Sequence, residues 1–309
     1  MSENNEYLAF DLGGTYLKYA LMSSDGTISF KDKVPSPARD CDVDGFFEVF
    51  KRIIVQYEDL INGIVVSLPG IIDSDEGIIR AIGAFPIMNN YEIQTEMQLR
   101  FNLPVSIEND GKCAALAELW KGNLKGVNDG AVMVLGTAVG GGIVLDGKLR
   151  KGIHFSAGEY SGVCIDANHT RESLSYMASL GAKGLIRRVA ERCGEDPETL
   201  DGYSVFAKIE AGDEKAAEGL RDYTDALAMQ IFNLNIILDL EKICIGGGIS
   251  KQPALLASLK ESIRHLKEVH PDLRAGVQLP LPDVDICRFY NDSNLIGALY
   301  SFLLKNDAI

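Results

Sequence analysis

The chain has 309 residues, enough for two domains of ordinary size, and its apolar and charged fractions are those of a soluble globular protein. Its formal net charge of −14 argues against a nucleic acid or an anionic membrane surface as the main partner. No apolar run is long enough to span a bilayer, residues 1–6 do not resemble a signal peptide, and the six scattered cysteines form no C-x-x-C pair. We therefore expect a cytoplasmic protein without a disulfide framework.

Residues 7–28 predict two strands around a tight glycine turn, followed by a third strand. An apolar strand at 7–10 leads into Asp11-Leu12-Gly13-Gly14-Thr15, and the next strand covers 16–22. Paired glycines leave backbone N–H groups open to an anion, and Lys18 adds a cation. A carboxylate is repelled by a phosphate unless a divalent metal lies between them, so the turn suggests Mg²⁺ and a nucleotide phosphate. A plain hairpin with an exposed Asp11 explains the stretch equally well.

The next segments alternate helical and strand patterns. An irregular loop at 84–90 carries Asn89 and Asn90, which is a natural place for hydrogen bonds to a polar ligand. The predicted elements of this part are a helix at 42–60, a strand at 64–66 with a turn at 67–70, a helix at 92–101, a strand at 104–107 and a helix at 112–121.

The opening pattern then recurs. A strand at 131–135, a glycine turn at 136–142 and a strand at 143–145 are again followed by an Asp-Gly hairpin signal. The two copies lie about 120 residues apart, which indicates an internal repeat of one supersecondary unit.

A third glycine turn, Gly246-Gly247-Gly248, follows a predicted strand at 242–245. None of the three turns fits the Walker or the dinucleotide Rossmann pattern. Together they suggest one nucleotide held between two similar lobes. The remaining predicted elements are a loop around Glu159, helices at 173–193, 213–240 and 253–269, a strand at 284–289 and a final helix from 291.

These motifs, in this order and over nearly the whole chain, resemble the ROK family of repressors and sugar kinases, within the hexokinase–actin–Hsp70 superfamily. The matching residues are Asp11 to Lys18, Pro69-Gly70, Glu108-Asn109-Asp110, Leu135 to Gly142, Gly158-Glu159, Gly246 to Gly248 and Asn294 to Ala298. The resemblance implies an α/β protein with two lobes, each built on a βββαβα unit of the ribonuclease H-like, actin-like type. It places residues 1–121 and 290–309 in a smaller lobe, residues 122–289 in a larger one, and the active site in the cleft.

Carried over position by position, the resemblance makes Asp110 the catalytic base that accepts the proton of the attacking sugar hydroxyl. Asn109 and Glu159 match sugar ligands, and Gly70, Asn89 and Asn90 are placed on the same side. The positions that match ATP contacts are Asp11, Gly13, Gly14, Thr15, Lys18, Gly136, Thr137, Gly247 and Gly248, with Asp11 facing Mg²⁺ through water. A helix N-cap would also explain Asp110, and a solvated loop carboxylate would explain Glu159.

The chain departs from the family pattern on the sugar side. Tyr160-Ser161-Gly162 follows Glu159 where a zinc- and sugar-binding His is usual, and the cysteine-rich zinc loop is absent, so we expect no structural zinc. Ser175 takes the place of a sugar-binding Glu, Ser67 replaces a glycine before Pro69, and Ala138 replaces one in the phosphate turn. These changes concern the identity of the sugar more than the fold.

The leading hypothesis is an ATP-dependent kinase that phosphorylates a sugar hydroxyl, by family expectation the 6-hydroxyl of a hexose, as a glucokinase does. The alternatives are a kinase for an N-acylhexosamine such as N-acetylmannosamine or for a β-glucoside, and a sugar sensor without catalysis. A DNA-binding repressor is disfavoured because the first strand begins near Tyr7 and the charge is acidic. The expected partners are the sugar, ATP and a second copy in a homodimer, with no nucleic acid and no membrane.

Overall fold

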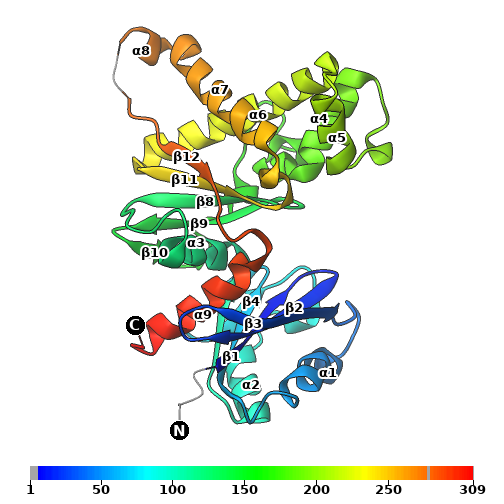
Figure 1. Cartoon of the computed structure of the whole chain (residues 1–309), viewed down its shortest axis with the longest axis vertical. Helices are drawn as coiled ribbons and strands as arrows, with labels where there is room; N and C mark the ends of the chain where they lie inside the picture. Colours follow the sequence, from blue (N-terminus) through cyan, green and yellow to red (C-terminus); the bar gives the residue numbers. More distant parts are fainter. Residues whose placement is uncertain (1–5, 277–278, 309) are drawn as a thin grey trace. The chain divides into compact units, whose positions relative to one another are not determined.

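The computed structural model describes residues 6–276 and 279–308, and the chain folds into two compact units (Figure 1). The first unit takes the chain up to Lys121, Leu149–Ala157 and everything from Asp292 onward. The second takes Gly122–Lys148 and Gly158–Asn291. The expected boundaries did not foresee that Leu149–Ala157 belongs with the first unit, where the Lys151 ammonium lies 2.6 Å from a carboxylate oxygen of Asp75.

The first unit is built on a five-stranded sheet in the order β3-β2-β1-β4-β7. The first three strands pair antiparallel, and β4 and β7 are added in parallel. Helix α1 (Val43–Ile54) begins at Asp42, whose side chain accepts the Gly45 N–H, and it buries one apolar face against the sheet. The other elements of this unit are β1 (Glu6–Leu12), β2 (Tyr16–Ser23), β3 (Ile28–Pro35), β4 (Ile61–Leu68), the hairpin β5 (Ile71–Asp73) and β6 (Ile78–Ala81), η1 (Pro86–Met88), α2 (Ile93–Phe101), β7 (Val105–Asn109), α3 (Asp110–Lys121) and α9 (Ser293–Lys305).

The second unit is built on a sheet in the order β10-β9-β8-β11-β12. Here β8 pairs antiparallel with β9, and β11 and β12 are added in parallel. The strands are β8 (Gly130–Leu135), β9 (Val139–Leu145), β10 (Lys148–Arg150), β11 (Lys242–Gly246) and β12 (Asp283–Ile286); the division between the units falls within β10, after Lys148. The helices are α4 (Ala182–Cys193), α5 (Gly202–Glu210), α6 (Glu214–Leu238), α7 (Pro253–Val269) and α8 (Pro271–Arg274). The short 3₁₀ turns are η2 (Tyr160–Gly162), η3 (Ser173–Ser175), η4 (Met177–Leu180), η5 (Pro197–Thr199), η6 (Gly248–Lys251) and η7 (Tyr290–Asp292), which ends where the first unit's last segment begins.

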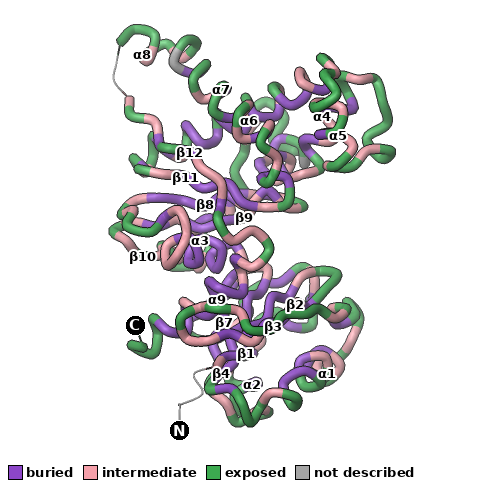
Figure 2. Tube along the Cα trace, viewed as in Figure 1, coloured by how far each residue is buried: buried purple, intermediate pink, exposed green. Residues whose placement is uncertain are grey.

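The two sheets share one strand order, and their corresponding strands pair in the same sense wherever the pairing is described. The repeat predicted from the glycine turns is therefore a repeat of sheet topology. In each sheet the glycine turn joins the central strand to its antiparallel neighbour, β1 to β2 and β8 to β9. Central strands β1 and β4 are buried along almost their whole length (Figure 2), which explains their continuous apolar runs.

Several predicted boundaries are wrong. The helix predicted at 42–60 ends at Ile54, and β4 begins at Ile61 because that residue pairs with Glu6 of β1. The helix predicted at 173–193 begins only at Ala182, whose N–H bonds to the Gly136 carbonyl; the preceding segment forms 3₁₀ turns. Helix α5 was not predicted, although Asp201 and Ser204 form a capping box at its start.

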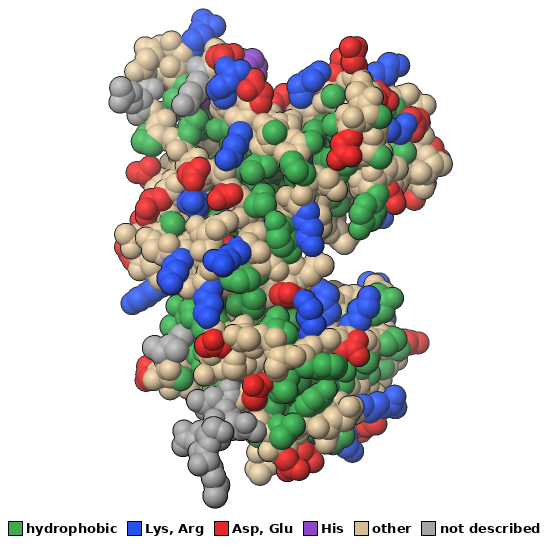
Figure 3. Space-filling view, viewed as in Figure 1, with side chains coloured by type: hydrophobic (Ala, Val, Ile, Leu, Met, Phe, Trp, Pro, Cys, Tyr) green, Lys and Arg blue, Asp and Glu red, His purple; other side chains and the backbone are tan. Residues whose placement is uncertain are grey.

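Within the described residues, no helix has both the length and the apolar character needed to cross a membrane. On the face drawn in Figure 3, acidic and basic side chains are interspersed with neutral ones. The net negative charge is therefore not gathered into one patch on that face.

Candidate active site

In the first unit, Asp11 lies at the end of β1 and is only 5% exposed. One carboxylate oxygen accepts hydrogen bonds from the Asn294 amide at 2.9 Å and the Ser67 hydroxyl at 3.2 Å, and the other pairs with the Lys18 ammonium at 3.0 Å. Ser67, which departs from the family pattern, thus helps to hold the Asp11 carboxylate. A buried carboxylate needs such partners, because an unpaired charge is costly to bury.

The turn between β1 and β2 is tight and open to solvent. The Gly13 N–H donates to the Tyr16 carbonyl, and the Ser36 side chain and main chain hold the Gly13 and Thr15 carbonyls. In the described part of the chain, the N–H groups of Gly14 and Thr15 donate to no other group. Both residues are exposed, and a Cβ at Gly14 would meet nothing within 4 Å. The turn therefore presents two backbone donors of the kind that hold a phosphate.

Asp11, Ser67 and Glu108 lie side by side in the register of β1, β4 and β7. The carboxyl ends of these three parallel strands therefore share one edge of the sheet, where ligands of open α/β sheets bind. Asn109 and Asp110 follow Glu108 on this edge, so the first unit brings the predicted base and the predicted metal-facing carboxylate to one edge of a single sheet.

Asp110 is the first residue of α3 and is partly exposed. One of its carboxylate oxygens accepts the Gly111 N–H at 2.7 Å and the Asn109 amide at 3.2 Å. The capping acceptor is Asn109, whose side-chain oxygen receives the Lys112 N–H at 2.9 Å. Asp110 is therefore positioned by the cap and does not itself provide it.

Asn109 is 2% exposed, and both its amide nitrogen and its oxygen are bonded within the chain. Its nitrogen also donates to the Gly70 carbonyl at 2.8 Å. Gly70 has φ of +98°, and a Cβ there would lie 2.2 Å from the Ala81 carbonyl oxygen, so only glycine fits. A direct sugar contact by Asn109 and Gly70 stays a prediction. In the structure, both residues help to hold the start of α3, where Asp110 lies.

Asn89 and Asn90 lie after η1 and are exposed. The Asn89 side-chain oxygen accepts the Ile82 N–H at 2.7 Å, which ties the loop to the end of the β5–β6 hairpin. Asn90 adopts a left-handed φ of 56°. Their predicted contact with the sugar is untested.

In the second unit, the glycine turn between β8 and β9 repeats the arrangement. The Gly136 N–H bonds within the turn, whereas the Thr137 N–H donates to no group among the described residues. Glu159 directly precedes η2, which is fixed to β9 by hydrogen bonds between the Ser161 hydroxyl and both main-chain groups of Val139. Glu159 is thus held beside the strand that follows the glycine turn.

The third glycine turn follows β11. Gly247 has φ of +95°, and a Cβ there would lie 2.2 Å from the Leu135 carbonyl oxygen, whereas a Cβ at Gly248 would meet nothing within 4 Å. Gly248 lines a cavity of about 370 Å³ with largely apolar walls. The cavity is lined by Leu135, Gly136, Ala182, Asp201, Gly202, Tyr203, Phe206, Gly248, Ile249, Lys251 and Gln252. Gly247 therefore permits close packing, and Gly248 is the member of the pair that faces a ligand-sized space.

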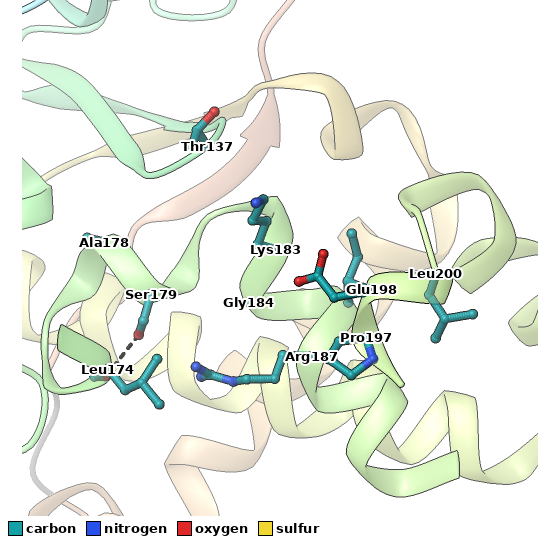
Figure 4. A pocket seen from close by; sticks show the side chains of 11 residues that line it. Thr137, Leu174, Ala178, Ser179, Lys183, Gly184, Arg187, Pro197, Glu198 and Leu200 are labelled. Carbon is teal, nitrogen blue, oxygen red and sulfur yellow. Dashed lines mark hydrogen bonds between the residues drawn. The ribbon is translucent and has the colours of Figure 1, made fainter. Parts of the chain in front are cut away.

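A second cavity, of about 300 Å³, lies beside Thr137 of the turn between β8 and β9 (Figure 4). Lys183, from the first turn of α4, points toward Thr137, and Glu198 extends into the same space. No hydrogen bond or ion pair joins the Lys183 ammonium to another described residue. Lys183 is a cation that sequence inspection missed, because the helix was predicted to start nine residues earlier.

The surroundings of the Asp11 carboxylate fit Mg²⁺ that is bound through a water molecule and do not fit direct coordination. Both carboxylate oxygens already accept hydrogen bonds, and among the described residues no three His, Cys, Asp or Glu side chains are grouped to hold a metal. Mg²⁺ bound with nucleotide takes most of its ligands from phosphate and water, so a single carboxylate is compatible with it.

The chain is similar to several known proteins over most of its length. A β-glucoside kinase from Klebsiella pneumoniae is 30% identical over 296 residues, which cover 95% of this chain and 95% of the relative. An N-acetyl-D-glucosamine kinase from Escherichia coli is 25% identical over 287 residues, covering 85% and 91%. The solved structure of a candidate N-acetylmannosamine kinase from Listeria monocytogenes has a TM-score of 0.85 at 29% identity, and the alignment covers 97% of this chain and 99% of that one.

The likeness to this solved structure confirms the expected fold, an α/β protein with two units of the actin-like ATPase type. The ROK family model matches residues 7–302. The chain therefore belongs to the ROK family.

Proposed function

We propose that this chain is an ATP-dependent sugar kinase whose acceptor is a β-glucoside or an N-acylhexosamine. Two of the relatives named above are kinases for sugars of these two kinds, and the third is a candidate kinase for an N-acylhexosamine. They favour the alternative reading over the glucokinase-like one that led the sequence analysis. The observation that carries the proposal is the partly exposed Asp110, held at the start of α3 by hydrogen bonds from Gly111 and Asn109.

On the acceptor side, Asp110 accepts the proton of the attacking hydroxyl. The new bond forms between the sugar oxygen and the γ-phosphorus, the bond from that phosphorus to the bridging oxygen breaks, and ADP leaves. Such a transfer asks the protein mainly for positioning and for neutralisation of charge. The cap formed by Asn109 and the carbonyl of Gly70 meets the first need, because it fixes the peptide that carries Asp110.

On the nucleotide side, each glycine turn offers open N–H groups for phosphate oxygens, Gly14 and Thr15 in the first unit and Thr137 in the second. The largely apolar cavity beside Gly248 takes the nucleoside, with Tyr203 and Phe206 offering aromatic surface. Lys183 adds positive charge near Thr137. Asp11 would hold Mg²⁺ through water, and the ion supplies neutralisation of the β- and γ-phosphate oxygens.

Two features of the second unit support an acceptor larger than glucose. At Gly162, where the family pattern has a His, the residue is exposed and a Cβ would meet nothing within 4 Å. At Ser175, where the pattern has a Glu, the hydroxyl donates to the His169 carbonyl instead of facing outward. Both positions thus carry less side chain than the family pattern provides, which leaves space for a second ring or an acyl group.

The test is a coupled ADP-release assay with Mg-ATP against glucose, mannose, N-acetylglucosamine, N-acetylmannosamine, cellobiose and gentiobiose. Asp110→Asn is measured alongside, with Asp59→Asn, at an exposed turn, as the matched control. We expect turnover with a β-glucoside or an N-acylhexosamine, abolished by Asp110→Asn and unchanged by Asp59→Asn. Glucose as the best acceptor would restore the glucokinase reading.

A sugar sensor without catalysis is the second candidate, favoured by the loss of two sugar ligands of the family. It predicts a sugar-dependent rise in melting temperature without ADP release. A cytoplasmic location, a homodimer and the absence of structural zinc belong to the proposal as well. Size-exclusion chromatography with light scattering and elemental analysis of the purified protein test the last two.

A further inference from the structure

Glu108 is a fully enclosed carboxylate, 1% exposed, two residues before Asp110. One of its oxygens accepts the backbone N–H of Asn109 at 2.9 Å, and the other accepts the Ser74 hydroxyl at 2.9 Å. Glu108 therefore fixes, by a hydrogen bond, the peptide group that joins it to Asn109, the residue that caps α3.

The position of β7 explains why that N–H needs a partner. Among the described strands, β7 is next to β4 alone and so forms an edge of its sheet. The Pro104 carbonyl faces β4, where it accepts the Ile64 N–H, and backbone groups alternate in direction along a strand. The N–H of Asn109 thus points to the open edge, where no strand can pair with it. A buried N–H without an acceptor is costly, and the Glu108 carboxylate supplies the acceptor.

Two lysines compensate the charge of Glu108. The Lys151 ammonium lies 3.8 Å from the second carboxylate oxygen and 2.6 Å from Asp75. Lys305, in the last turn of α9, donates to the Ser74 carbonyl and lies 3.5 Å from the Ser106 hydroxyl. Burial lowers the pKa of Lys305, although Glu108 acts in the opposite direction. Three distant segments of the chain, those of Ser74, Lys151 and Lys305, therefore lie around this one carboxylate.

We propose that Glu108 is a positioning residue for the phosphoryl transfer, which fixes the Asn109 peptide and through it the direction of the Asp110 carboxylate. The inference rests on the proposed function, because it assigns Asp110 the part of the base. It adds a residue to the site that touches neither substrate. A small displacement of a positioned base lowers the rate of the chemical step far more than it weakens substrate binding.

A purely structural ion pair would behave differently from a positioning residue. Loss of the pair would lower the melting temperature, and kcat per folded molecule would not change. Positioning predicts a loss of kcat with unchanged KM, and partial rescue by glutamine, since an amide oxygen still accepts the Asn109 N–H.

The experiment compares Glu108→Ala and Glu108→Gln with wild type, with Glu76→Gln, an exposed carboxylate of the neighbouring hairpin, as the matched control. Steady-state kinetics are measured with the acceptor found in the sugar panel, together with melting temperature and amide hydrogen exchange over residues 105–112. We expect Glu108→Ala to lower kcat about 30- to 100-fold with both KM values within about threefold of wild type. Glu108→Gln should recover at least about fivefold of that loss, and only Glu108→Ala should speed exchange over 105–112.

An unchanged kcat in folded Glu108→Ala, or exchange over 105–112 equal to that of wild type, would overturn the inference. The failure of the proposed function looks different: wild type then turns over no sugar. In that case the exchange measurement still decides whether Glu108 holds the end of β7.

Discussion

The side-chain amide of Asn294 donates a 2.9 Å hydrogen bond to the carboxylate of Asp11 across 283 positions of sequence. Asn294 lies in the first turn of α9, the last helix, and Asp11 lies at the end of β1, the first strand. Ser67 from β4 and Lys18 from β2 complete the shell around the carboxylate. The direction of the carboxylate proposed to face Mg²⁺ is therefore set by both ends of the chain.

Asn294→Ala should weaken both stability and the use of magnesium. The buried Asp11 loses one of its donors, so we expect the free energy of unfolding to fall by about 1–2 kcal/mol. The Mg²⁺ concentration for half-maximal ADP release should rise several-fold. Urea unfolding and a magnesium titration measure the two effects. Asn306→Ala, which loses a hydrogen bond at the other end of α9, is the control and should leave the magnesium titration unchanged. An unaltered titration in Asn294→Ala would separate Asp11 from the metal.

Gly247→Ala should lower the stability of the fold, whereas Gly248→Ala should weaken the use of ATP. At Gly247 the positive φ and the Leu135 carbonyl oxygen leave no room for a methyl group, so we expect a loss of stability of about 2–3 kcal/mol. At Gly248 the methyl group enters only the cavity, so Tm should hold while the KM for ATP rises several-fold. Thermal unfolding and ATP kinetics on both variants decide the matter. Equal KM values for Gly248→Ala and wild type would remove the nucleoside from this cavity.

Lys183→Met should weaken ATP binding without destabilising the fold. The side chain is exposed and lines the cavity beside Thr137, so its ammonium is available to a phosphate. We expect the Kd for ATP, measured by calorimetry, to rise about tenfold, in line with the loss of one charge-assisted contact. Lys260→Met, on the exposed side of α7, is the matched control. A Kd equal to that of wild type would place the phosphates away from Lys183.

Asp73 makes a contribution to the free energy of unfolding that depends on pH. Burial alone would raise the pKa of Asp73, but the Glu76 N–H and the Arg80 guanidinium outweigh it and hold the pKa below its usual value. A lowered carboxyl pKa stabilises the fold above the unfolded pKa, near about 4, and this contribution is lost as the pH falls through the folded pKa. Urea unfolding at several pH values should give a stability gap between wild type and Asp73→Asn of about 1–2 kcal/mol at pH 7, shrinking below pH about 4. A gap that stays constant with pH would contradict the assignment.

Much of the fold could be predicted from local patterns. The strand at 7–10, the glycine turns and the helix at 253–269 depend on residues that are neighbours in sequence, and the repeated turn predicted the repeated sheet order. The errors fall where distant contacts decide. The start of α4 depends on Gly181 and on a bond from Ala182 to Gly136. The segment Leu149–Ala157 joins the first unit through pairs that Lys151 makes with Asp75 and Glu108.

The sequence by itself determined the fold class, the family resemblance and the positions of the glycine turns, because glycine conformation and apolar periodicity act over a few residues. Only the tertiary structure decided which side chains support the site. It made Asn109 the cap beneath Asp110, gave Ser67 and Asn294 to Asp11, and enclosed Glu108 among Ser74, Lys151 and Lys305. A buried polar group must find partners wherever packing brings them, and no local pattern shows which segments packing will bring together.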